Sequence, residues 1–201
     1  LIHVDIDASQ PGKNFPAEIG IHADARIGLR ALLSELDGTA VDRAAWVDAA
    51  RAARAEVEAD LSRRAPLEWD LMQTVRRALP RETIITADPH VLGYWSRSHL
   101  PIYQPRTWLH DLAFGTLGYA FPVALGAKLA APDRPVVCLT GDGGFLFTGQ
   151  ELATAVQQGL SVVTVIINDN AYGAIKEDFL RDYGQAYEVD LVNPDFVAYA
   201  E

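Results

Sequence analysis

The segment from residue 135 to residue 167 constrains the fold more than any other part of the chain. Residues 135–140 and 161–167 are apolar at nearly every position, and a helix-like stretch separates them. Strands that are apolar on both sides are typical of a parallel sheet covered by helices on both faces. The expected fold class is therefore α/β, a three-layer parallel sheet with helices on both faces.

Neighbouring segments continue the alternation of helices and strands. Residues 67–79 and 118–131 are expected to form helices, and residues 83–87 a short β-branched strand. Between the two apolar strands, the capping box Thr148-x-x-Glu151 predicts the start of a helix. Gly159 predicts its end, because glycine readily adopts the left-handed conformation that closes a helix.

The N-terminal third has a different pattern. Residues 1–6 alternate as a strand does, and Asp24 is a suitable cap for a helix over residues 24–36. An Ala- and Arg-rich helix is expected over residues 42–64, with its arginines on a solvated face. We therefore expect the end of an upstream domain over residues 1–37, a helical linker over 38–65 and a main domain over 66–201. The first and last residues lie in a strand-like and a helix-like segment, so we expect a piece of a longer protein.

The charge balance and the cysteine content exclude several classes of function. The chain has 17 Lys and Arg against 27 Asp and Glu, a net charge of −10, so no basic stripe is available for nucleic acid or an anionic membrane. Its single cysteine, Cys138, lies in an apolar run and is expected in the core of a protein from a reducing compartment. No apolar run approaches the ~20 residues that span a bilayer. We expect a soluble, cytoplasmic protein.

Asp142 and Asp169 come shortly after the two apolar strands. Parallel strands end at one edge of the sheet, where open α/β sheets bind ligands. Two carboxylates there repel each other unless a cation lies between them, and Mg²⁺ favours carboxylate, phosphate and water oxygens. Gly141, Gly143 and Gly144 allow backbone N–H groups to approach a phosphate. The spacing predicts a magnesium–diphosphate site.

Other interpretations of these motifs fit less well. Gly-Asp-Gly or Asn-Asp-Asn alone is also typical of a tight turn without a ligand, but their occurrence together in one strand–helix–strand unit disfavours that explanation. The P-loop pattern Gly-x-x-x-x-Gly-Lys-Ser/Thr is absent from the sequence, and so is Gly-x-Gly-x-x-Gly after a strand.

At these residues the sequence resembles the thiamine-diphosphate-dependent enzymes of the acetolactate synthase and benzoylformate decarboxylase group. The family signature of Gly-Asp-Gly followed by Asn-Asn corresponds to residues 141–143 and 168–169, and residues 115–118 also resemble the family. The resemblance covers residues 66–201, the thiamine-diphosphate-binding domain, which we expect to be truncated at its C-terminus. More weakly, it covers residues 1–36 as the tail of a central Rossmann-like domain.

The resemblance implies a role for each matching residue. Asp142 and Asp169 would bind Mg²⁺ through their side chains, and Ala171 would bind it through its backbone carbonyl. Leu117 would separate the two rings of the cofactor, and the carbonyl of Gly115 would accept from its exocyclic amine. The full set of implied cofactor-binding residues is Gly115, Leu117, Gly141, Asp142, Gly143, Gly144, Asp169, Ala171, Tyr172, Gly173 and His90.

The chain departs from the family pattern in three places. Asp169 replaces the second signature Asn, and its charge beside an anionic cofactor predicts a tighter dependence on Mg²⁺. Residues 174–179 lack the Met and Gln-Trp of true acetolactate synthases, which leaves that specific activity open. Where relatives carry Gly-Gln-His, only His90 matches, and a surface histidine without a ligand is the alternative there.

The resemblance implies an enzyme that decarboxylates or carboligates 2-oxo acids with thiamine diphosphate and Mg²⁺. The glutamate that activates the cofactor is expected in a pyrimidine-binding domain of a partner subunit, so no catalytic residue is expected in this chain. We therefore expect the chain alone to be inactive and the whole protein to be a homodimer or homotetramer. The alternatives are the diphosphate-binding subunit of a split decarboxylase and a non-catalytic nucleotide-binding or assembly relative. The substrate, and whether the central domain holds FAD or an adenine nucleotide, stay open.

Overall fold

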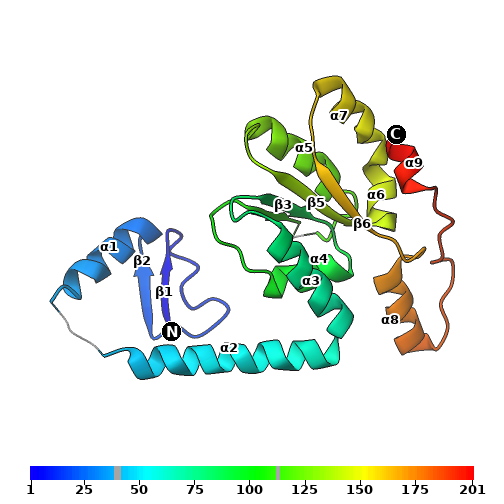
Figure 1. Cartoon of the computed structure of the whole chain (residues 1–201). Helices are drawn as coiled ribbons and strands as arrows, with labels where there is room; N and C mark the ends of the chain where they lie inside the picture. Colours follow the sequence, from blue (N-terminus) through cyan, green and yellow to red (C-terminus); the bar gives the residue numbers. More distant parts are fainter. Residues whose placement is uncertain (39–41, 112–113) are drawn as a thin grey trace. The chain divides into compact units, whose positions relative to one another are not determined.

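A computed structural model describes residues 1–38, 42–111 and 114–201 of the chain. It divides into two units, Leu1–Ala55 and Glu56–Glu201, and helix α2 (Ala44–Arg64) crosses the division (Figure 1). Residues 39–41 of the predicted linker lie outside the described residues. None of the described helices is both long enough and apolar enough to cross a membrane.

Four parallel strands form the sheet of the larger unit, in the order β4-β3-β5-β6. Strands β3 (Ile84–Ala87), β5 (Val136–Gly141) and β6 (Val163–Ile167) lie where the apolar runs predict them. Strand β4 (Trp108–His110) was not expected, because three residues are too few to show an alternating pattern.

Helices cover both faces of this sheet, which confirms the three-layer α/β prediction (Figure 1). Val136 and Cys138 of β5 pack into the cluster formed with α5, α6 and α7, and Val137 and Leu139 pack into the cluster with α3 and α4. Cys138 is fully buried, as predicted, and burial raises the pKa of its thiol to about 12. The covering helices are α3 (Pro66–Ala78), α4 (Val91–His99), α5 (Ala120–Ala130), α6 (Asp142–Thr148) and α7 (Leu152–Gln158).

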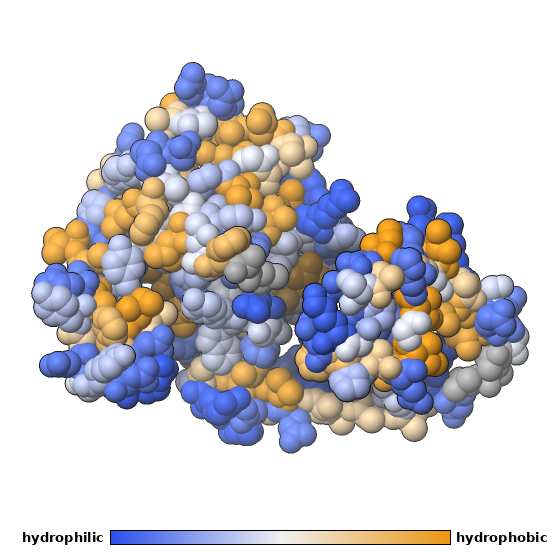
Figure 2. Space-filling view, turned by 180° about the vertical axis from the view of Figure 1, so that it is seen from behind, coloured by the Kyte–Doolittle hydropathy of each residue, from blue (hydrophilic) through white to orange (hydrophobic). Residues whose placement is uncertain are grey.

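Strand β6 is less covered than its composition predicts. It lies at the edge of the described sheet, and Val163 is 63% exposed. A hollow of about 930 Å³ lies beside it, with Phe121, Phe145 and Ile166 among its lining residues. On the visible side of the larger unit, apolar and hydrophilic residues are mixed (Figure 2). The expectation that both faces of residues 161–167 are covered is therefore wrong at Val163.

A helical segment starts after Thr148, as the capping box predicts, but the capping hydrogen bonds are not made. Thr148 is the last residue of α6 and the N-cap of the short 3-10 turn (Gly149–Glu151) that runs into α7, and its side chain makes no capping hydrogen bond. Its hydroxyl instead donates to the carbonyl of Gly118 at 3.1 Å. Glu151 ends this turn, and its carboxylate accepts from the hydroxyl of Thr154. Gly159 does end α7, in the left-handed conformation with φ 62°, as predicted.

The smaller unit contains one strand more than the sequence predicts. Strand β1 (Ile2–Asp5) pairs in parallel with β2 (Ile19–His22), which was not expected, and helix α1 (Ala25–Glu35) follows. Asp24 caps α1 as predicted, since its side chain accepts from the N–H groups of Arg26 and Ile27. The assignment of this unit to a central domain stays a prediction.

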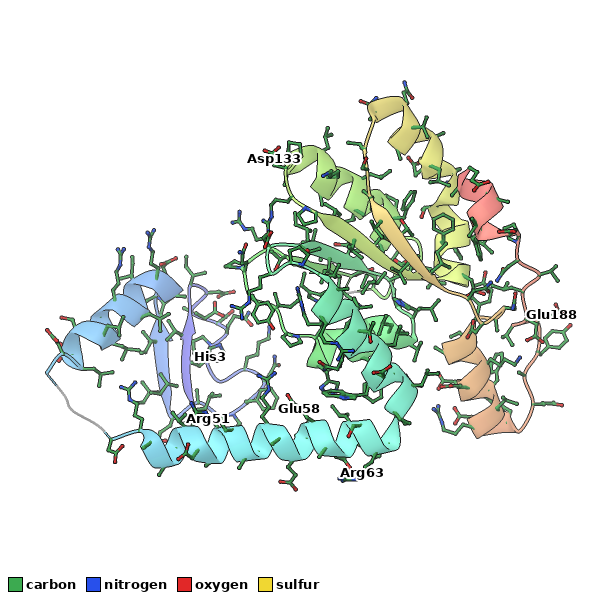
Figure 3. All side chains as sticks on the ribbon, in the orientation of Figure 1. His3, Arg51, Glu58, Arg63, Asp133 and Glu188 are labelled. Atoms are coloured by element: carbon green, nitrogen blue, oxygen red, sulfur yellow. The ribbon has the colours of Figure 1, made fainter. Side chains whose placement is uncertain are left out.

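The arginines of α2 lie on a solvated face, as expected. The side chains of Arg51 and Arg63, both labelled in Figure 3, are 76% and 70% exposed and pair with Asp48 and Asp60 one helical turn away. Near the C-terminus, α8 (Gly173–Tyr183) and α9 (Phe196–Ala200) complete the described helices, and α9 lies in the helix-like run that the sequence predicts.

Candidate functional site

Strands β5 and β6 bring Asp142 and Asp169 to one edge of the sheet. Gly141 at the end of β5 is in register with Ile167 at the end of β6, so both aspartates leave the sheet at the same edge. Partial desolvation of its carboxyl group raises the pKa of Asp169, and the nearby charge of Asp142 raises it further. The two carboxyl groups, 27 positions apart in the sequence, therefore lie close together, as their placement after parallel strands predicts.

This donor set fits a magnesium ion. A cation between two close carboxylates removes the repulsion that raises the pKa of Asp169. Within the described ranges, no three His, Cys, Asp or Glu side chains gather in a way that could hold a metal ion. Asp142 and Asp169 offer carboxylate oxygens, which suit Mg²⁺ because it combines a few protein oxygens with phosphate and water oxygens in its shell.

A pocket of about 450 Å³ lies beside the two aspartates. Its wall combines the end of β5, the loop before α5 and the loop after β6. All the residues that the resemblance implies for the cofactor line this pocket: His90, Gly115, Leu117, Gly141, Asp142, Gly143, Gly144, Asp169, Ala171, Tyr172 and Gly173. The larger hollow beside β6 contains none of them.

The first turn of helix α6, directly after β5, has no room for a side chain at two positions. A Cβ at Gly143 would lie 2.7 Å from the ring of Tyr172, and a Cβ at Gly144 would lie 2.7 Å from Oδ2 of Asp88. Real Cβ atoms do not approach other atoms so closely, so a side chain at either position would displace its neighbour. The buried backbone beside Asp142 therefore depends on these glycines.

Asp88 holds the loop before α5 in place, a role that the sequence did not suggest. Its Oδ1 accepts from the N–H of Ala120 at 2.7 Å, and its Oδ2 accepts from the hydroxyl of Thr140 at 2.8 Å. The residue is only 1% exposed, and this burial raises the pKa of its carboxyl group. Asp88 thus joins the end of β3 to β5 and to the start of α5.

Residues 184–193, here called the strap, hold the loop after β6. The N–H of Tyr172 donates to the carbonyl of Val189 at 2.8 Å, and the N–H of Leu191 donates to the carbonyl of Asn170 at 2.7 Å. Glu188, labelled in Figure 3, lies on this strap. Asn170 itself has a left-handed backbone with φ 56°, a conformation that asparagine tolerates better than most residues.

Asn193, at the end of the strap, is a site residue that sequence reasoning missed. Its side-chain amide donates to Oδ2 of Asp142 at 2.6 Å and to Oδ1 of Asn168 at 2.8 Å. Because 51 positions separate Asn193 from Asp142, no local spacing links the two residues.

His90 is a buried, neutral imidazole beside the pocket. Its Nδ1 lies 2.8 Å from the carbonyl oxygen of Asp88, which can only accept, so Nδ1 carries the proton. Burial lowers the pKa of His90 to about 4. Nε2 is buried and has no hydrogen-bond partner among the described residues. A contact between His90 and a diphosphate stays a prediction.

Comparison with known proteins agrees with this site. Residues 91–201 match the thiamine pyrophosphate enzyme, C-terminal TPP binding domain. The chain is 38% identical to a probable 2-ketoarginine decarboxylase of Pseudomonas aeruginosa, covering 98% of this chain and 35% of the relative. It is 35% identical to a probable acetolactate synthase large subunit of Methanocaldococcus jannaschii and 33% identical to acetolactate synthase isozyme 1 large subunit of Escherichia coli. These alignments cover 100% and 92% of this chain and 36% and 33% of the relatives.

The chain thus spans about a third of the length of the curated relatives that it matches. The matched region contains the ends of β5 and β6, the strap and all the pocket residues except Pro89 and His90. The chain belongs to the thiamine pyrophosphate enzyme family and contains its C-terminal TPP binding domain.

Proposed function

We propose that the whole protein is a thiamine-diphosphate-dependent enzyme that decarboxylates or carboligates 2-oxo acids, and that this chain supplies its magnesium–diphosphate site. The observation that carries the proposal is the convergence of Asp142 and Asp169 at one sheet edge, on one pocket. Family membership supports the cofactor, and the donor set supports the metal.

In this proposal the chain binds and orients the cofactor. Asp142, Asp169 and the carbonyl of Ala171 hold Mg²⁺, and the N–H groups of Gly143 and Gly144 bind the diphosphate. Tyr172, Gly173, Gly141 and His90 complete the pocket wall. Leu117 would separate the two rings of the cofactor, and the carbonyl of Gly115 would accept from its exocyclic amine. When bound, thiamine diphosphate supplies the carbon nucleophile and the electron sink for loss of carbon dioxide.

The proposal assigns activation to residues outside this chain. A glutamate from a pyrimidine-binding domain of a partner subunit would activate the cofactor, so the active form is a homodimer or homotetramer and the chain alone is inactive. We place the enzyme in the cytoplasm, consistent with its single buried cysteine. FAD is no part of this proposal, because none of the described residues bears on it.

The same proposal assigns the parts of the chain. Residues 1–37 would be the end of a central domain, residues 38–65 a helical linker and residues 66–201 the thiamine-diphosphate-binding domain. Limited proteolysis of the whole protein tests this division, and we expect the first cuts within residues 38–65. First cuts inside the sheet of the larger unit would contradict it.

Between the two activities, decarboxylation has one specific observation in its favour. Residues 174–179 form the first part of α8 beside the pocket and lack the Met and Gln-Trp expected of acetolactate synthases. The relative at 38% identity is named as a probable 2-ketoarginine decarboxylase. We therefore expect carbon dioxide release from 2-oxo acids without formation of acetolactate from pyruvate.

Calorimetry on the whole protein tests the cofactor site. We expect thiamine diphosphate to bind in the presence of Mg²⁺, and binding to be lost with EDTA or in an Asp142→Ala variant. An exposed-surface variant, Gln185→Ala, serves as the control. Metal-independent binding, or full binding by Asp142→Ala, would disprove the proposed site.

A further inference from the structure

The side-chain amide of Asn193 contacts both halves of the carboxylate site. Its Nδ2 donates to Asp142 beyond β5 and to Asn168, which directly precedes Asp169 beyond β6. We propose that Asn193 is a positioning residue of the magnesium site, which orients the Asp142 carboxylate and fixes it relative to the Asp169 loop. This inference rests on the proposed function.

Neighbouring hydrogen bonds determine which end of the Asn193 amide faces the site. Oδ1 of Asn168 accepts from the backbone N–H of Asn170 at 3.2 Å, so that atom is an oxygen. The carboxylate of Asp142 offers only oxygens as well. A flipped Asn193 amide would place its oxygen against both, so Nδ2 must face the site and both of its hydrogens are used.

The hydrogen bond from Asn193 constrains the carboxylate of Asp142, which is more deeply buried than that of Asp169. Asp142 is 2% exposed, and Asn193 donates to its Oδ2, which fixes the orientation of the carboxylate. A carboxylate that is already oriented loses less conformational freedom when it binds a metal. Loss of a hydrogen bond to a metal ligand, from a residue that does not itself bind the metal, typically lowers metal affinity by about 10–100-fold.

The backbone on both sides keeps Asn193 at this position. On one side, Leu191 donates its N–H to the carbonyl of Asn170. On the other side, Asp195 caps α9 by accepting from the N–H groups of Val197 and Ala198. Asn193 therefore does not depend on the metal for its place in the fold, which separates its effect on the ion from an effect on folding.

The test measures Mg²⁺ affinity in the whole protein at a fixed concentration of thiamine diphosphate, by calorimetry and by quenching of tryptophan fluorescence. For Asn193→Ala we expect the dissociation constant for Mg²⁺ to rise about 10-fold or more. Thiamine diphosphate binding should return to the wild-type level at saturating Mg²⁺, which a misfolded pocket would not do. Asn193→Ser is the second, more conservative variant. It retains one hydrogen-bond donor for two acceptors, so we expect a loss of Mg²⁺ affinity smaller than that of Asn193→Ala.

The matched control is Gln185→Ala, which removes an amide from the exposed part of the same strap and should leave Mg²⁺ affinity unchanged. Wild-type Mg²⁺ affinity in both Asn193 variants, with affinity lost in Asp142→Ala, would overturn the role of Asn193 and leave the proposed function standing. Wild-type affinity in Asp142→Ala as well would overturn the proposed function itself.

Discussion

Asp142 and Asp169 lie at the same sheet edge, but different forces hold them in place. Asp142 is 2% exposed and follows β5, a central strand whose residues are buried on both faces. Asp169 is exposed and follows β6, the edge strand, where backbone hydrogen bonds from the strap hold the loop. One half of the site is therefore part of the core, and the other depends on a segment far along the chain.

Because of this difference, substitutions on the two sides of the site should affect different quantities. Changes around Asp142 disturb buried, close-packed groups, so they should lower the free energy of unfolding. Changes around Asp169 disturb exposed groups outside the core, so they should alter metal binding more than stability. The following experiments, from the largest expected effect to the smallest, test this separation.

The largest effect is expected on replacing the buried ligand. Asp142→Asn should weaken Mg²⁺ binding by more than about 100-fold, beyond the range for loss of a hydrogen bond to a metal ligand, because a charged ligand is lost. Asp169→Asn keeps an oxygen ligand and removes the extra negative charge, so it should instead reduce the dependence of thiamine diphosphate binding on Mg²⁺. Magnesium titrations of the whole protein measure both, and equal losses in the two variants would contradict the comparison.

The stability of the buried half of the site, around Asp142, should depend on pH because His90 is buried beside it. The pKa of His90 is lowered from 6.5 to about 4 in the folded state, so stability is fully present above pH 6.5 and falls as the pH drops toward 4. The loss attributable to this group is about 3 kcal/mol. Urea denaturation of the cofactor-free protein between pH 7 and pH 4 measures it. His90→Gln should flatten the dependence, and His99→Gln, at a half-buried position on α4, should not.

Substitution of two glycines, one beside Asp142 and one beside Asp169, compares the two halves of the site directly. Gly144→Ala places a Cβ against Asp88 and the Thr140 hydroxyl in a buried turn, so it should lower the free energy of unfolding by about 1–3 kcal/mol. Gly173→Ala meets only the exposed carboxylate of Asp169, which can move aside, so it should weaken Mg²⁺ binding with little loss of stability. Chemical denaturation measures the free energy of unfolding of both variants, and metal titration measures their Mg²⁺ affinity. A large loss of stability in Gly173→Ala would refute the separation.

The smallest effect is expected at the strap's exposed ion pair. Lys176 of α8 lies 2.6 Å from Asp190, and both side chains are accessible to water. Lys176→Gln should therefore lower the free energy of unfolding by less than about 1 kcal/mol, and less at high salt. Thermal denaturation at two salt concentrations measures the difference, and a salt-independent loss would indicate a packing role for Lys176 instead.

The main strands of the sheet and the meeting of Asp142 and Asp169 could be predicted because their sequence signals are local. Runs of apolar residues determine β3, β5 and β6, and a strand–helix–strand unit can bring Asp142 and Asp169 together only at one edge. The short strands β2 and β4 carry too few residues for a periodic pattern.

The remaining site residues could not be predicted, because their partners lie far away in the sequence. Asp88 contacts Ala120 and Thr140, which are 32 and 52 positions away. Thr148 does precede a helical turn, as its local motif predicts, but its hydroxyl donates to the carbonyl of Gly118, 30 positions away, and makes no capping hydrogen bond. Asn193 lay in a segment without any motif.

The distance between Asn193 and Asp142 has a consequence for biosynthesis. The two residues are 51 positions apart, so a ribosome adding about 5–20 residues per second makes them roughly 3–10 s apart. Asp169 is made 27 positions after Asp142, so for the last 24 of these 51 positions the nascent polypeptide has both aspartates but lacks the amide that joins Asp142 to the Asp169 loop. Loading with metal and vitamin-derived cofactor should accordingly be one of the last events in maturation of this domain.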